Sequence, residues 1–122
     1  PGLLDALDAL PDRPAGTPAG AYSHAKRAVR ALVARSAAAW GARGARIVSL
    51  SPGMITTPMG RLEFEQQPAM KMLLDRTPLA RLGEAAEIAS VVAFLCSPAA
   101  SFVTGCDLLV DGGVCAALGI AS

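Results

Sequence analysis

The stretch "RIVSLSPG", residues 46–53, decides the fold, because it is typical of a short strand buried inside a parallel sheet. Its β-branched and apolar residues suit an extended chain that packs on both faces. Pro52-Gly53 ends the run with a turn. We therefore predict a central parallel strand over residues 46–51.

Helical patterns flank this strand on both sides. Upstream, apolar residues recur at helical spacing from Ala25 to Trp40, and glycines follow, which predicts a helix over about residues 21–41. Downstream, "GEAAEIASVVAFLCSP", residues 83–98, predicts a second helix with one apolar stripe. Glu84 and Glu87 in its first turn favour the helix dipole, and the final proline stops it.

The remaining segments complete an alternating pattern. "DLLVDGG", residues 107–113, predicts a second buried strand that ends at a glycine turn. Residues 54–82 are irregular and divided by prolines, although residues 64–76 have the pattern for one or two helical turns. A connection of this length is commonly a lid or a binding loop. Residues 1–20 predict a short helical turn followed by a loop.

Two parallel strands joined by a helical crossover make half of an α/β layer. Strands buried on both faces need neighbours, because their edge N–H and C=O groups would otherwise lie unpaired. We therefore predict the α/β class, as the C-terminal part of a doubly wound, Rossmann-like parallel sheet with flanking helices. The chain starts with Pro1 rather than Met, so we expect the true start to lie elsewhere.

Composition excludes several classes of function. The 122 residues fit one modest domain, and 52% hydrophobic against 17% charged residues predicts that a partner or further chain covers much of the surface. Scattered basic residues and a net charge of +1 argue against nucleic acid. Charged residues and prolines interrupt every apolar run, so we expect no membrane span and no signal peptide.

The cysteines are expected to be core thiols in a reducing compartment, which favours a cytoplasmic protein. Cys96, Cys106 and Cys115 have neither the close pairs of a zinc site nor the even count of a disulfide framework. His24 is the only histidine. We therefore predict no metal site.

Tyr22 and Lys26 in "YSHAK" are four residues apart, so a helix places them on one face. A phenol with a pKa near ~10 is a poor base at neutral pH, but a fixed ammonium nearby and the positive end of a helix favour the phenolate. Such a tyrosine exchanges a proton with an alcohol or a carbonyl oxygen. The alternative is a packed aromatic residue beside a solvated lysine.

"SPGMITTPM", residues 51–59, stands where ligands bind in open α/β sheets, just beyond the carboxyl end of a strand. Backbone N–H groups and the hydroxyl of Thr57 at this point suit a planar amide. Standing alone, the same residues fit a turn with a capping threonine.

In this combination, the sequence from Ala21 to Val114 resembles the short-chain dehydrogenases/reductases. The resemblance implies that Tyr22 is the catalytic tyrosine and that Lys26 activates it and binds the nicotinamide ribose of NAD or NADP. It also implies that a further segment holds the nicotinamide carboxamide, namely Pro52, Gly53, Ile55 and Thr57. Asp111-Gly112-Gly113 matches a C-terminal turn that we interpret as structural. Within the family, the sequence is most similar to bacterial 3α-hydroxysteroid dehydrogenase/carbonyl reductases.

The sequence departs from the family pattern at two points. In the family, the glycine-rich pyrophosphate loop and the residue that selects NAD or NADP belong to an N-terminal half, which is outside these residues. This chain alone is therefore expected neither to bind a dinucleotide nor to catalyse the reaction. The catalytic serine is also missing before Tyr22, and Thr17 stands too close to replace it. We interpret residues 1–20 as the tail of an insertion and residues 21–122 as the C-terminal half of the domain.

Other residues receive plainer interpretations. His24 is expected to be a solvated or packing residue, not a catalytic one. Methionines and leucines between residues 54 and 74 either line an apolar substrate pocket or close the core. The pairs Arg27/Arg30 and Glu84/Glu87 are interpreted as solvated helix faces. Extra apolar residues on the second helix indicate a subunit interface, so we expect a homo-oligomer, a dimer or a tetramer.

The sequence therefore predicts an NAD(P)-dependent oxidoreductase that interconverts a secondary alcohol and a ketone, with a steroid or another apolar carbonyl compound as substrate. One competing hypothesis is a non-catalytic binding or oligomerisation piece of the same fold. Another is a helical interaction module in which the Tyr/Lys pair is incidental.

Overall fold

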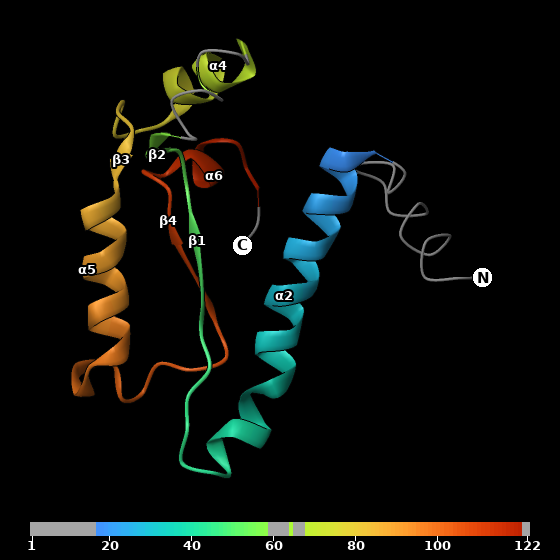
Figure 1. Ribbon diagram of the computed structural model, residues 1–122, viewed down its shortest axis with the longest axis vertical. Coiled ribbons are helices and arrows are strands. Elements are labelled where there is room, and N and C mark those ends of the chain that lie inside the picture. The colour runs from blue at the N-terminus through green and yellow to red at the C-terminus, as the bar shows by residue number, and fades with distance from the viewer. Residues whose placement is uncertain (1–16, 59–63, 65–67, 121–122) are drawn as a thin grey trace.

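The computed structural model describes residues 17–58, 64 and 68–120. Helices and short parallel strands alternate along these residues, which confirms the α/β class (Figure 1). The elements in chain order are α2 (Pro18–Gly41), β1 (Ser49–Pro52), β2 (Ile55–Thr56), α4 (Pro68–Arg76), β3 (Gly83–Glu84), α5 (Ala85–Cys96), the 3-10 helix η1 (Pro98–Ala100), β4 (Asp107–Val110) and α6 (Val114–Ala117).

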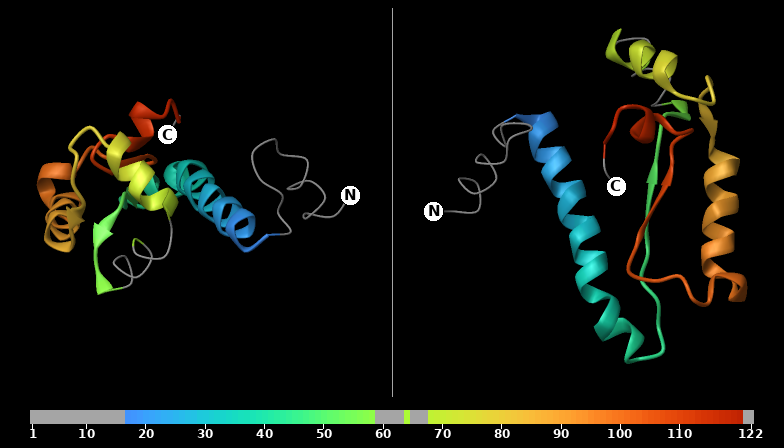
Figure 2. Two further views of the ribbon diagram at one scale, coloured as in Figure 1. Left: turned by 90° about the horizontal axis from the view of Figure 1, so that it is seen from above. Right: turned by 180° about the vertical axis from the view of Figure 1, so that it is seen from behind.

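The central strands are β1 and β4, which pair in parallel with Ser49 opposite Asp107 and Pro52 opposite Val110. Figures 1 and 2 show α5 and α2 on opposite sides of this strand pair. The amino end of α2 and the carboxyl end of β1 lie at the same end of the molecule (Figure 1). The predicted parallel pairing of two strands across a helix is therefore confirmed.

The strand predicted over residues 46–51 is shorter and more polar than expected. Its regular part is Ser49–Pro52, and Ser49 and Ser51 donate hydrogen bonds of 2.6 and 2.8 Å to the two carboxylate oxygens of Asp107. The prediction of burial on both faces is wrong for the described residues, since β1 is half-buried and pairs there with β4 alone. Serines at alternate positions place hydroxyl groups on one face of the strand.

The helix α2 begins three residues before the predicted start. Thr17 is its N-cap and accepts a hydrogen bond of 3.1 Å from the backbone N–H of Gly20. Pro18 stands in the first turn, where its missing N–H costs nothing and its fixed φ suits a helix. The loop predicted up to residue 20 is therefore wrong at residues 18–20, because a capping threonine followed by proline starts a helix. Residues 1–16 of that predicted segment lie outside the described residues.

The other two predicted helices are confirmed. The helix α5 ends at Cys96, and Ser97 accepts a hydrogen bond from the N–H of Ala99 as Pro98 starts η1. The helix α4 supplies the helical turns expected within residues 64–76. Residues 54–82 also contain β2, which no sequence pattern indicated.

The cysteines are not core thiols, so that prediction is wrong. Cys96 and Cys106 are exposed and Cys115 is half-buried. The exposed two stand at the last residue of α5 and just before β4, at element ends that the described chain leaves uncovered. Buried apolar side chains among the described residues are Val33, Ala100 and Val114.

Two further observations apply to the described ranges alone. No helix there has the length and apolar content needed to cross a bilayer. Nor do three His, Cys, Asp or Glu side chains gather there closely enough to hold a metal ion.

Candidate active site

The predicted acid/base pair lies in the second and third turns of α2. The ammonium nitrogen of Lys26 is 5.4 Å from the centre of the Tyr22 ring, which is within the range of a cation–π contact. Tyr22 is 66% exposed, so its hydroxyl group is accessible to a ligand. The four-residue spacing thus brings a phenol and an ammonium together on an open face, as the sequence predicted.

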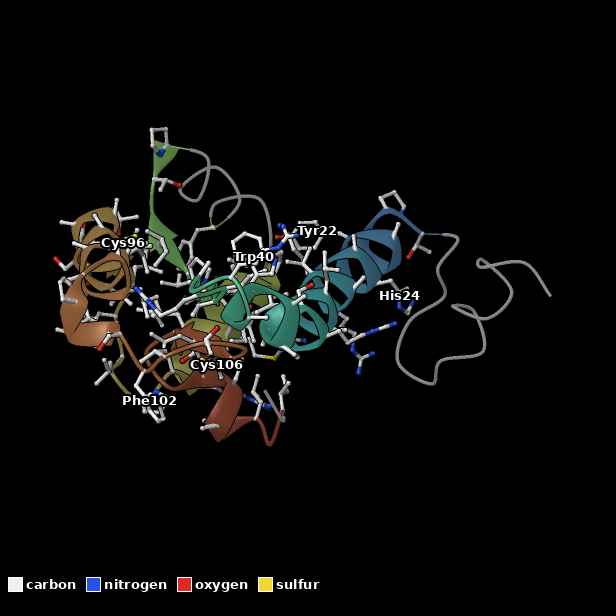
Figure 3. All side chains as sticks on the ribbon, turned by 90° about the horizontal axis from the view of Figure 1, so that it is seen from below. Tyr22, His24, Trp40, Cys96, Phe102 and Cys106 are labelled. Atoms are coloured by element: carbon white, nitrogen blue, oxygen red, sulfur yellow. The ribbon has the colours of Figure 1, made fainter. Side chains whose placement is uncertain are left out.

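His24 has a different environment from Tyr22. The side chain is only 6% exposed. Figure 3 shows it leaving α2 on another side of the helix from Tyr22, as a separation of two helical positions requires. The structure therefore favours the packing interpretation of His24 over the solvated one.

The Pro52-Gly53 bend is held against the end of β4. The N–H of Gly53 donates a hydrogen bond of 3.0 Å to the carbonyl of Val110. A Cβ atom at Gly53 would lie 2.6 Å from the Cα of Asp111, so the two backbones approach as closely as glycine allows. This contact fixes where the chain turns after β1.

The Asp111-Gly112-Gly113 turn supports this bend. The carboxylate of Asp111 accepts hydrogen bonds of 2.8 and 3.0 Å from the N–H groups of Gly113 and Cys115. Burial acts to raise the pKa of Asp111, but the backbone hydrogen bonds from Cys115 and Gly113 outweigh it and leave this pKa lowered. Both glycines have positive φ, and the carbonyl of Gly112 accepts a hydrogen bond from Leu79. These contacts agree with a structural role for the turn.

The segment that follows the bend is held by a second strand pair. Ile55 lies opposite Gly83 and Thr56 opposite Glu84, so β2 and β3 pair in parallel. The carbonyl of Met54 accepts a hydrogen bond of 2.9 Å from Gly83. Of the predicted carboxamide segment, Ile55 is thus fixed by β3, and Thr57 follows it half-buried.

The sequence reasoning missed an ion pair next to this strand pair. The guanidinium of Arg81 donates hydrogen bonds of 2.8 and 2.6 Å to the two carboxylate oxygens of Glu87. The same carboxylate accepts a hydrogen bond of 2.8 Å from the N–H of Glu84. Glu87 is exposed, as the solvated-face interpretation expects, but it also pairs with Arg81. A sequence signal existed only for the contact with Glu84, because the three-residue spacing of Glu84 and Glu87 at a helix start is typical of a capping box.

The hydrogen bonds from Arg81 and from the N–H of Glu84 lower the pKa of Glu87 from 4.5 to about 2. A lowered pKa means that the charged form stabilises the fold above about pH 4.5 and that this stability is lost as the pH falls towards 2. We expect Glu87→Gln to be less stable than the wild type at pH 7 and the difference to narrow below pH 4. The urea unfolding midpoints of the wild type and of Glu87→Gln, measured from pH 7 to below pH 4, give this stability difference.

Salt provides a control for the same prediction. Arg81 and Glu87 are exposed, so 1 M salt should reduce the stability difference at pH 7 through screening. A difference that stays constant with both pH and salt would contradict an ionic origin.

The structure only partly brings together the methionines that the sequence placed in a substrate pocket or in the core. Met54 borders a small cavity of about 90 Å³ beside the strand pair, together with Ile88 and Val110. Met72 is exposed on α4 and Met70 is half-buried there. Met59 lies outside the described residues. The structure thus leaves both interpretations of the methionines open.

Comparisons with known proteins show what this chain is similar to. Residues 10–115 match a family model described as Enoyl-(Acyl carrier protein) reductase. The galactitol 2-dehydrogenase (L-tagatose-forming) of Cereibacter sphaeroides is 45% identical over 95 residues, which make up 78% of this chain and 37% of that protein. The chain therefore spans little more than a third of this curated relative.

Solved structures show the same likeness. A structure from Agrobacterium tumefaciens with bound NADP is 36% identical, with a TM-score of 0.73 over 80% of this chain and 39% of that one. The 4-hydroxyisoleucine dehydrogenase complexed with NADH is 31% identical, with a TM-score of 0.72 over 88% of this chain and 42% of that one.

Proposed function

The chain belongs to the short-chain dehydrogenase/reductase family, and from this we propose that the intact protein interconverts a secondary alcohol and a ketone with NAD or NADP. The observation that carries the proposal is the Lys26 ammonium 5.4 Å from the ring of an exposed Tyr22. An acid/base pair of this kind is what the reaction needs, because the alcohol must lose a proton as it is oxidised.

The residues present fit the nicotinamide end of the cofactor. Lys26 is exposed and carries donors for the hydroxyl groups of a ribose. Among the described residues, β2 pairs on one edge only, so its other edge offers backbone groups to a carboxamide. Ile55 belongs to β2, Pro52 and Gly53 precede this strand and Thr57 follows it, and we assign the carboxamide contact to this segment. When bound, the nicotinamide supplies the acceptor or donor for hydride.

The reaction assigns separate tasks to the two side chains. In the oxidative direction Tyr22, as phenolate, accepts the proton of the substrate hydroxyl group while the carbon gives up a hydride. In the reductive direction the same hydroxyl group returns the proton to the carbonyl oxygen. Lys26, whose ammonium lies 5.4 Å from the centre of the Tyr22 ring, orients the ribose. A serine upstream of this chain holds the substrate oxygen.

The substrate proposal is an apolar ketone, with a steroid as the first compound to try and a sugar alcohol as the alternative. Met54 borders a cavity and supports an apolar substrate, because a flexible thioether suits a bulky ligand. A particular similarity of the intact protein to hydroxysteroid dehydrogenases is part of the same proposal. The sugar alcohol is suggested by the galactitol-oxidising relative.

The assembly proposal is a cytoplasmic homo-oligomer. Val92 and Phe94 are exposed on α5, as are Val29 and Leu32 on α2. Exposed apolar residues on two helices suit a subunit interface. The same observation supports the second candidate function, a non-catalytic oligomerisation piece of the same fold.

Cofactor binding and turnover of the intact protein separate the two candidates. We expect the fluorescence of NADH or NADPH to change on binding, and a panel of steroid and sugar alcohols to reveal turnover. Intact protein that binds neither cofactor would favour the oligomerisation piece.

Lys26→Met tests the assigned pair directly. We expect kcat/KM to fall by at least about 100-fold and the cofactor to bind more weakly, because both the charge and the ribose donors are lost. Steady-state kinetics and fluorescence titration measure these two effects. Lys26→Arg is the matched control and should retain more activity, since it keeps the positive charge. Unchanged kinetics in Lys26→Met would remove the assigned role.

A further inference from the structure

The position of β2 depends on β3, a strand of only two residues. Their contact consists of the parallel pairing of Ile55 with Gly83 and the hydrogen bond from Gly83 to the carbonyl of Met54. A Cβ atom at Gly83 would lie 2.8 Å from the Cδ1 of Ile55, so the two strands are in close contact. A shift of β3 would therefore disturb its contacts with β2.

One carboxylate holds both ends of β3. Glu87 receives two hydrogen bonds from Arg81, two residues before β3, and one from the N–H of Glu84, the last residue of β3. Arg81 also donates a hydrogen bond of 3.0 Å to the carbonyl of Leu82. Glu87 belongs to the first turn of α5, so the carboxylate ties β3 to a helix of 12 residues.

Apolar packing supports β3 only weakly. A cavity of about 90 Å³ lies against it, bordered by Met54, Gly83, Ile88 and Val110. The exposed side chains of Arg81 and Glu87 also border this cavity, so it opens to solvent. Among the described residues, β3 lies against no filled apolar core on this side, and the hydrogen bonds to Glu87 are its contacts there.

We propose that Arg81 and Glu87 are positioning residues that set the place of the β2 backbone and thereby its hydrogen bonds to the nicotinamide carboxamide. This inference rests on the proposed function, because it requires β2 to hold the carboxamide. It assigns Arg81 and Glu87 no contact with the substrate or the cofactor. Their effect is on how well the intact enzyme recognises the amide group.

A cofactor analogue with an acetyl group in place of the carboxamide isolates this effect. The analogue keeps the carbonyl oxygen and replaces the amide NH2 with a methyl group, so it loses the hydrogen bonds that the NH2 donates. The measurement is the ratio of kcat/KM for the natural cofactor to kcat/KM for the analogue. Intrinsic differences in hydride transfer cancel when this ratio is compared between variants.

We expect the wild type to prefer the natural cofactor. In Arg81→Gln and Glu87→Gln the ratio of the two kcat/KM values should fall on the order of 10-fold, because a small displacement of β2 misaligns its hydrogen bonds to the amide group. Glu87→Gln should stay folded, since the oxygen of its amide can still accept from the N–H of Glu84. Exchanging the charges in Arg81→Glu with Glu87→Arg should restore part of the preference. Ser97→Ala, at the opposite end of α5, is the matched control and should leave it unchanged.

The outcomes distinguish the two proposals. A wild type without preference for the carboxamide would end the assignment of β2 and this inference with it. A wild type with a preference that both variants retain would overturn the positioning role and leave the proposed function intact. If the glutamine variants unfold, Arg81→Lys takes their place, because it keeps the charge but removes the bidentate hydrogen bonding. An unchanged kcat/KM ratio in Arg81→Lys would equally overturn the inference.

Discussion

Tyr22→Phe is expected to abolish turnover of the intact protein while preserving most of its cofactor affinity. The substitution removes one hydroxyl group and keeps the ring that lies beside the Lys26 ammonium. General acid/base catalysis by a positioned side chain contributes about 10²- to 10⁴-fold to a rate, so kcat should fall by that order. Steady-state turnover of the alcohol and fluorescence titration with NADH or NADPH measure the two quantities separately.

The matched control for this prediction is Arg35→Gln, an exposed position on the same helix that contacts neither site residue in the proposal. It should leave kcat and cofactor affinity unchanged. Turnover of Tyr22→Phe at the wild-type rate would remove the acid/base mechanism. Loss of cofactor binding together with turnover would instead point to a damaged fold, which a comparison of unfolding midpoints would reveal.

Gly53→Ala should strongly destabilise the protein and displace the proposed carboxamide segment. The new methyl group would lie 2.6 Å from the Cα and 2.9 Å from the Cβ of Asp111. Backbone atoms cannot rotate away, so the ends of β1 and β4 must separate and weaken the hydrogen bond from Gly53 to Val110. Overpacking of this kind costs ~1–3 kcal/mol, which urea unfolding of the intact protein detects.

Gly41→Ala provides the comparison for Gly53→Ala. Gly41 ends α2, and apart from its chain neighbours and the backbone of its own helix no atom lies within 4 Å of a Cβ placed there. Alanine at a helical position stabilises by ~0.5–1 kcal/mol relative to glycine, so this variant should be neutral or more stable. Equal stability of the two variants would show that the Pro-Gly bend does not require the close approach to Asp111.

The helices could be predicted because their information is local. Apolar residues at helical spacing indicated α2 and α5, and the structure confirms both. The start of α2 was placed three residues late because the glycines and prolines of residues 10–20 were given more weight than the capping pattern of Thr17 and Pro18. The capping residues at the start of α2 therefore fix its first residue, which the apolar spacing alone placed wrongly.

The second strand pair could not be predicted from a pattern. Two residues per strand are too few to show an alternation, and the partner of Ile55 is a glycine beyond α4. The pairing of Arg81 with Glu87 could not be predicted either, since the two residues lie six positions apart on either side of β3. No helix or strand periodicity connects such positions.

The sequence by itself determined the α/β class, the helices, the parallel strands β1 and β4, and the meeting of Tyr22 with Lys26 on one helical face. The helices and the contact of Tyr22 with Lys26 follow from spacings within one helix, and the two strands follow from short apolar runs that alternate with helices. The tertiary structure alone decided that Gly53 lies against Asp111 and that Glu87 holds β3. The physical reason is that these contacts join separate elements, whose meeting depends on how the chain packs and not on any local preference.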